Sequence, residues 1–199
     1  MTEKELLRAT LREFRDAMVW KLEGLGDADM RMPMTPTGTN LLGLVKHLAG
    51  LEYGYLGEVF GRPAPERMSW IDDDSIWEGA DMWVAPGEST DYIVGLYRRA
   101  CAHADETIEA LELSTVGTVP WWEEGKRDAT LRQLILRMIG ETARHAGHAD
   151  IVRELLDGAG GRSPGDRSFP ADADPAWWRE YVGRIRDSAA TAPPDASSD

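Results

Sequence analysis

The 199-residue sequence contains little that could cross-link the chain or anchor it in a membrane. It has one cysteine, Cys101, and no apolar run that approaches the length of a membrane span. A single cysteine excludes a disulfide within the chain, and a spanning helix needs about 20 consecutive apolar residues. The first residues, MTEKELLRATLREF, are charged and amphipathic, which is not typical of a signal peptide. We therefore expect a cytoplasmic protein that does not bind membranes.

Positive charge is also scarce. The sequence has 22 Lys and Arg against 35 Asp and Glu, which gives a net charge of −13. No basic stripe offsets this acidic total, so the composition argues against binding to nucleic-acid phosphates or anionic lipids. Hydrophobic residues make up 42% of the chain, which is ordinary for a globular protein with a sizeable core. We predict a single domain over residues 1–188 and a disordered tail over 189–199, AATAPPDASSD.

Helical periodicity, by contrast, is abundant. Apolar residues recur at three- and four-residue steps in four segments, with no convincing alternating strand between them: 3–25, 40–60, 89–111 and 128–158. Asn40 is a good N-cap for the second segment. Two long connections, 62–88 and 113–127, join the later helices, and the aromatic residues around Trp177 suggest a short final helix that docks on the others. The pattern predicts an all-α protein, a four-helix bundle with long loops and a short C-terminal helix.

Three of the four histidines lie where a helix should be apolar. His47 is on the inward stripe of the second segment, while His145 and His148 are on the inward stripe of the fourth. Glu141 stands one turn before His145, so their side chains share a helix face, and His148 continues it. Ionisable groups on a buried stripe are costly unless a partner satisfies them.

Each of these residues also has an ordinary structural interpretation. His47 alone would more often be a core histidine bonded to a carbonyl, and Glu141 alone could pair with Arg144 or Arg137. The four together favour a divalent cation, because imidazole and carboxylate are suitable ligands for Zn²⁺, Ni²⁺ or Fe²⁺. Three protein ligands leave a coordination position open, which is typical of a catalytic metal site.

Two stretches carry a family resemblance that covers most of the chain. TPTGTNLLGLVKHLAGLEYGYLGEVFG, followed downstream by MIGETARHAGHADIVRELLDG, resembles the actinobacterial branch of the DinB-like superfamily. That superfamily includes the metal-binding domain of mycothiol-dependent maleylpyruvate isomerase and bacterial thiol S-transferases. The resemblance implies a DinB-like four-helix bundle in which His47, Glu141 and His145 hold a divalent metal, Zn or Ni. Relatives usually have glutamine at the position of His148, so the resemblance implies a supporting role for His148, behind the ligands or as a base.

The resemblance also implies an activity. A low-molecular-weight thiol such as mycothiol would bind the metal as a thiolate and attack a small-molecule electrophile, in an S-transferase or isomerase reaction. Two alternatives stay open: a metal-dependent hydrolase in which bound water is the nucleophile and His148 the base, and a non-catalytic metal-binding stress protein. Dimers are frequent in the superfamily, so a homodimer is the expected assembly.

Overall fold

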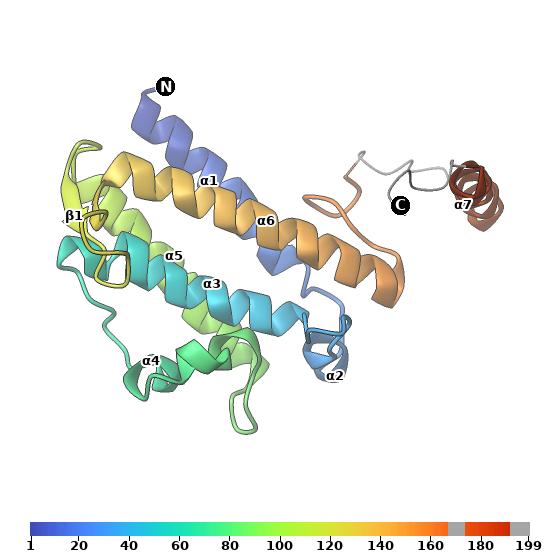
Figure 1. Cartoon of the computed structure of the whole chain (residues 1–199), viewed down its shortest axis with the longest axis horizontal. Helices are drawn as coiled ribbons and strands as arrows, with labels where there is room; N and C mark the ends of the chain where they lie inside the picture. The colour runs from blue at the N-terminus through green and yellow to red at the C-terminus, as the bar shows by residue number, and fades with distance from the viewer. Residues whose placement is uncertain (167–173, 192–199) are drawn as a thin grey trace, which may run out of the picture. The chain divides into compact units, whose positions relative to one another are not determined.

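The structure, a computed structural model, describes residues 1–166 and 174–191 of the chain. The chain forms two units, residues 1–164 and 165–199. In the first unit four long helices form a bundle, α1 (Glu3–Trp20), α3 (Leu41–Leu56), α5 (Thr90–Ala110) and α6 (Leu131–Asp157) (Figure 1). The predicted all-α fold is confirmed, and none of the described helices is long and apolar enough to span a membrane.

The helix ends follow from local sequence signals. The Asn40 side chain accepts a hydrogen bond from the Gly43 amide at the start of α3, and Thr130 and Gln133 form a reciprocal capping box at the start of α6. Gly158 ends α6 in the left-handed conformation with φ 78°. Helix α1 ends at Trp20, about a turn before the predicted boundary, because residues 21–24 form a turn instead.

The connections add shorter elements. Helix α2 (Asp27–Arg31) follows α1, and α4 (Ser69–Asp72) lies in the long connection between α3 and α5 with the 3-10 turns η1 (Glu58–Phe60), η2 (Ser75–Glu78) and η3 (Ala80–Met82). The sequence shows no convincing alternating strand and suggests only a short extended segment within 113–127, whereas β1 (Val116–Thr118) and β2 (Asp128–Thr130) pair antiparallel before α6. Three-residue strands are too short to show an alternating pattern.

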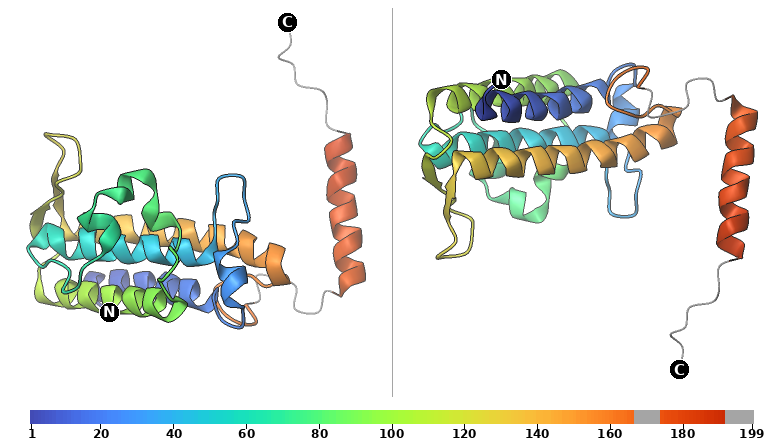
Figure 2. Two further views of the ribbon diagram at one scale, coloured as in Figure 1. Left: turned by 90° about the horizontal axis from the view of Figure 1, so that it is seen from below. Right: turned by 90° about the horizontal axis from the view of Figure 1, so that it is seen from above.

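The contacts between helices define their directions. Glu3 pairs with Arg132 and the Lys21 carbonyl accepts from Arg153, so α1 and α6 run parallel. Tyr55 contacts Arg137 while His47 contacts His145, so α3 and α6 run antiparallel. Figure 2 shows α3 and α6 in one layer and α1 and α5 in the other. Because α3 and α5 are parallel neighbours, the chain must return along the bundle between them, and residues 57–89 are this crossover.

The second unit contains α7 (Pro175–Ala190), capped by Asp174 and begun by proline at its first position. Trp177 stacks on Tyr181 with ring centroids 5.1 Å apart. The final helix thus forms as predicted, while its docking and the single domain over 1–188 stay predictions. Of the predicted tail, residues 189 and 190 belong to α7, and 192–199 lie outside the described residues.

Candidate functional site

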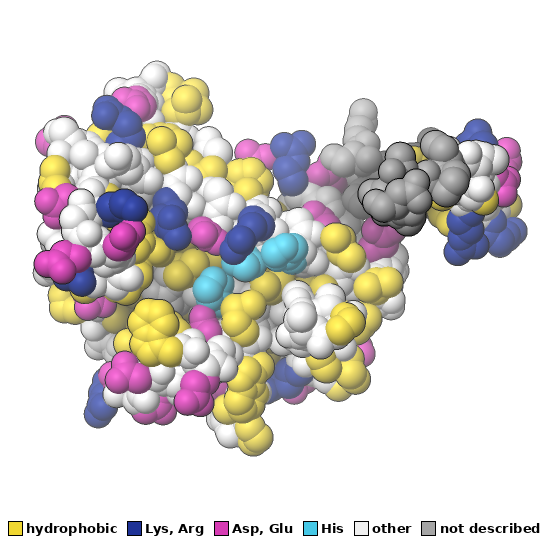
Figure 3. Space-filling view, viewed as in Figure 1, with side chains coloured by type: hydrophobic (Ala, Val, Ile, Leu, Met, Phe, Trp, Pro, Cys, Tyr) yellow, Lys and Arg dark blue, Asp and Glu magenta, His cyan; other side chains and the backbone are white. Residues whose placement is uncertain are grey.

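Helices α3 and α6 bring two of the predicted ligands together. The rings of His47 and His145, 98 positions apart in the sequence, have centroids 5.0 Å apart and meet edge to face at 75°. Figure 3 shows histidine side chains gathered in one patch on the face that α3 and α6 form. The contact follows from the antiparallel packing of two helices that each carry a histidine on the stripe facing the other.

His145 is the most enclosed member of this group, with 4% of its surface exposed. Its Nε2 atom is buried and has no hydrogen-bond partner among the described residues. Burial lowers the pKa of His145 from 6.5 to about 4, and the neighbouring His47 adds to the effect. With the proton of the neutral imidazole on Nδ1, this Nε2 would present an unshared electron pair, which is what a cation ligand requires.

His47 is held by a residue that the sequence did not point to. Its Nδ1 lies 2.6 Å from Oδ2 of Asp81, a buried residue of η3 in the crossover. A carboxylate accepts only, so Nδ1 carries the proton and Nε2 is left as the basic nitrogen. Metal-binding histidines commonly have such a carboxylate behind them.

Gly43 is what allows the crossover to reach His47. A Cβ at this position, one turn before His47 on α3, would collide with the backbone carbonyl of Met82. That carbonyl accepts a hydrogen bond of 3.0 Å from the Asn40 side-chain amide. The glycine and the N-cap therefore seat η3 directly on α3, with Asp81 next to the imidazole.

Glu141 lies beside His145, but its carboxylate is paired with arginines. Its Oε2 is 3.7 Å from Nε2 of His145 and accepts a 3.0 Å hydrogen bond from Arg144, and its Oε1 is 3.8 Å from Arg137. The side chain is 20% exposed. The ion pair with Arg144, one of the sequence-based alternatives, is thus present in this structure.

The structure corrects the prediction for His148, which is exposed rather than inward-facing. Three residues along α6 turn it about 60° around the axis from His145, away from the buried Thr142 and Ala149. Its Nδ1 nevertheless lies 3.4 Å from Nδ1 of His145. His148 therefore stands between the buried imidazole and solvent.

The three predicted ligands are neighbours, but their donor atoms do not converge on one point. Within the described residues no set of three His, Cys, Asp or Glu is already arranged around a cation position. The donor set still fits a divalent cation chemically: two imidazoles, one with an unpartnered buried nitrogen, and one carboxylate.

An aromatic wall borders the site two turns along both helices. The hydroxyl of Tyr55, on α3, accepts hydrogen bonds of 3.2 Å from the indole nitrogens of Trp121 and Trp122 in the β1–β2 connection. The Arg137 guanidinium lies over the rings of Tyr55 and Trp122, 5.0 and 5.3 Å from their centroids. This aromatic group borders the α3–α6 face near the end of α3, about two helical turns from His47 and His145.

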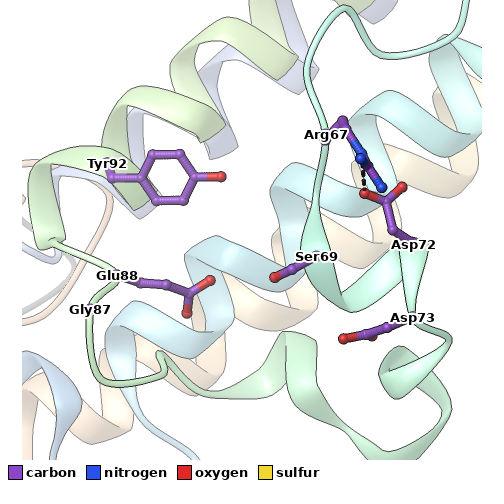
Figure 4. Close-up of a pocket in the computed structure, with 7 residues that line it drawn as sticks. All are labelled: Arg67, Ser69, Asp72, Asp73, Gly87, Glu88 and Tyr92. Carbon is purple, nitrogen blue, oxygen red and sulfur yellow. Dashed lines mark hydrogen bonds and ion pairs between the residues drawn. The ribbon is translucent and has the colours of Figure 1, made fainter.

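Cys101 and a carboxylate-lined cleft lie apart from the face formed by α3 and α6. Burial raises the pKa of Cys101, on α5, well above that of an ordinary thiol, so it is not an intrinsic nucleophile at neutral pH. A cleft of about 680 Å³ lies between the crossover and α5 and is lined by Asp72, Asp73 and Glu88, together with Arg67, Ser69 and Tyr92, but by no histidine (Figure 4).

Comparison with known families gives one match. A family model described as mycothiol-S-transferase matches residues 6–158, which include nearly all of the bundle and His47, Asp81, Glu141 and His145. No curated protein matches the chain.

Proposed function

The chain belongs to the mycothiol-S-transferase family, and from this we propose that it joins the sulfur of mycothiol, or of a closely related small thiol, to a carbon electrophile. The observation that carries the proposal is the unpartnered, buried Nε2 of His145, beside His47 and Glu141. The raised pKa of Cys101 supports an external thiol as the nucleophile.

We propose that His47, Glu141 and His145 hold a divalent cation, Zn²⁺ or Ni²⁺. A cation bound there would stabilise the thiolate form of the substrate at neutral pH. With Asp81 accepting from Nδ1 of His47, Nε2 would be the nitrogen available to the cation. Glu141 would exchange its hydrogen bond from Arg144 for the cation.

In the proposed reaction the S–H proton leaves and a carbon–sulfur bond forms. In a substitution the leaving group departs with its bonding electrons; in an addition to a double bond the neighbouring carbon takes up a proton instead. His148 is placed to accept the thiol proton, because it is exposed and its ring lies against His145, with centroids 5.4 Å apart. Addition followed by elimination of the thiol would isomerise a double bond, so the same groups serve the isomerase variant.

The metal site is tested first and without reference to activity. Protein purified without added metal is analysed for bound Zn and Ni, beside His47→Ala, His145→Ala and the control His103→Ala. His103 lies on α5 and contacts the Arg62 carbonyl, away from the site. We expect near-stoichiometric metal in the wild type and the control, and loss in the two site variants. Unchanged metal in both would refute the ligand assignment.

The activity is tested by following consumption of mycothiol with chlorobimane as the electrophile. We expect turnover that is lost on removing metal and restored on adding it. Activity without thiol would instead favour the hydrolase, and a metal-loaded protein inert toward every cellular thiol would favour the non-catalytic alternative.

A further inference from the structure

The guanidinium N–H groups of Arg137 donate to no other residue that the structure describes. In the part of the chain that the structure describes, its guanidinium donates no hydrogen bond, and its ion pair with Glu141 has an N–O distance of 3.8 Å, too long for one. By contrast, Arg15, Arg99 and Arg132 each direct two or more guanidinium nitrogens at carboxylates.

The guanidinium is nevertheless held in place. It lies over the rings of Tyr55 and Trp122, and the Tyr55 hydroxyl is itself fixed by both indoles of Trp121 and Trp122. Stacking on aromatic faces restrains the guanidinium without occupying its N–H groups. A guanidinium that is held in place and still has N–H groups available is suited to bind a planar oxyanion such as a carboxylate, which pairs with arginine through two parallel hydrogen bonds.

The surroundings are accessible and apolar. Arg137 is 43% exposed and Trp121 38%. Trp121 lies against α3 at Gly54, where a Cβ would come within 3.2 Å of its ring. Figure 3 shows the surface hollowed beside the histidine patch, with hydrophobic side chains on its floor.

Arg137 is also on the same face of α6 as the proposed ligands. Glu141 follows it by one turn and His145 by two, which corresponds to about 12 Å along the helix. A molecule of that size could place an anionic group on Arg137 and its reacting carbon near His145.

We propose that Arg137, with Tyr55, Trp121 and Trp122, forms the binding subsite for the electrophile, and that this substrate is a planar, unsaturated or aromatic carboxylate. The inference rests on the proposed function for the role of the bound molecule but not for its binding. In a chain with a net charge of −13, this positive group supplies the local attraction that an anionic substrate needs.

The test uses 4-methylbenzoate and 4-methylbenzamide, which have the same shape but differ in charge and react with no thiol. Their affinities for the wild type are measured by calorimetry, beside Arg137→Met, Arg137→Lys and the control Arg98→Met. Arg98 is an exposed arginine on α5, so its variant removes an equal charge elsewhere. We expect the wild type to prefer the benzoate by about tenfold, R98M to keep the preference, R137K to keep part of it and R137M to lose it.

A carboxylate could also bind a metal ion, so His145→Ala is included. A preference that survives in H145A and is lost in R137M supports the subsite, even if the protein proves to bind no metal or thiol. A preference that is lost in H145A and kept in R137M places the benzoate on the metal, which overturns the subsite and leaves the proposed function standing. Equal affinities for the two probes in the wild type also overturn it. Should R137M not fold, an unchanged preference in R137K and R137Q would do the same.

Discussion

Two of the places in which the bundle buries ionisable side chains differ in how completely those side chains are hydrogen-bonded. Between α1, α3 and α5, Arg15 directs three nitrogens at Glu52 and Asp105, with distances of 2.6 to 2.7 Å. Between α3 and α6, His145 is buried with an unpartnered nitrogen and an acidic neighbour at 3.7 Å. Arg15, Glu52 and Asp105 satisfy one another's hydrogen bonds, so this network needs no further partner. The buried Nε2 of His145 has no partner among the described residues, so it is available to a ligand from outside the chain. The contrast teaches that burial of a charge whose hydrogen bonds are complete is not itself a sign of function, and the unpartnered nitrogen of His145 is the feature on which the proposed ligand position rests.

The largest effect should come from breaking the completed network. Glu52→Ala leaves the Arg15 guanidinium buried without its main partner, and we expect the free energy of unfolding to fall by ~3–5 kcal/mol. Metal content should not change. Urea denaturation measures the loss, with the exposed Glu58→Ala as control. A loss no larger than that of the control would mean that Arg15 and Glu52 are not a structural pair.

An intermediate effect should come from the carboxylate behind His47. Asp81→Asn replaces a carboxylate that can only accept with an uncharged amide that can also donate, so the imidazole tautomer is no longer fixed, and we expect zinc affinity to fall by about 10–100-fold with little loss of stability. Competition with a chromophoric chelator measures the affinity. Asp72→Asn, in the same crossover but paired with Arg67, is the matched control. Equal zinc affinities in the two variants would show that Asp81 does not support metal binding by His47.

The smallest effect should come from the incomplete site itself. The pKa of His145 is about 4, lowered from 6.5 by burial, so between these pH values the unfolded chain takes up a proton that the folded chain does not. Metal-free protein should therefore lose stability as the pH falls from about 6.5 toward about 4. His145→Leu, which cannot titrate, should show a shallower decline and lie within ~1 kcal/mol of the wild type near neutral pH.

Urea unfolding in EDTA at several pH values in this window measures the two slopes. The control is His103→Leu, which replaces the histidine on α5 outside the site. A variant H145L with the same acid slope as the wild type would mean that this imidazole is protonated normally in the folded state.

Much of this molecule can be read from its sequence because the signals are local. The caps at Asn40 and Thr130 and the stop at Gly158 set helix ends, and the apolar stripes set which faces turn inward. The stripes place His47 and His145 on inward faces, but which residues meet also depends on the direction and axial register of the two helices. The prediction that these two histidines are neighbours therefore rests on the family resemblance, and their ring contact agrees with it.

The rest depends on where distant segments lie. Asp81 carries no periodic signal, and its place beside His47 depends on the course of the crossover and on the missing side chain at Gly43. His148 is exposed because it lies about 60° around the helix axis from His145, an angle too small for the periodicity of the sequence to assign it to the inward or the outward side. Arg137 looks like any surface arginine until Tyr55 and Trp122 are placed beneath it.

The parallel arrangement of α3 and α5 has a consequence for how this site could change. The segment between them has to travel the length of the bundle whatever its residues are, so its size is dictated by packing elsewhere. Among the described residues of that obligatory span, Asp81 is bonded to His47 and Met82 is seated on α3, while Met68 and Trp70 belong to the hydrophobic core. The exposed positions between these anchors are free to vary, and with them the surface beside the histidines, while the bundle stays as it is.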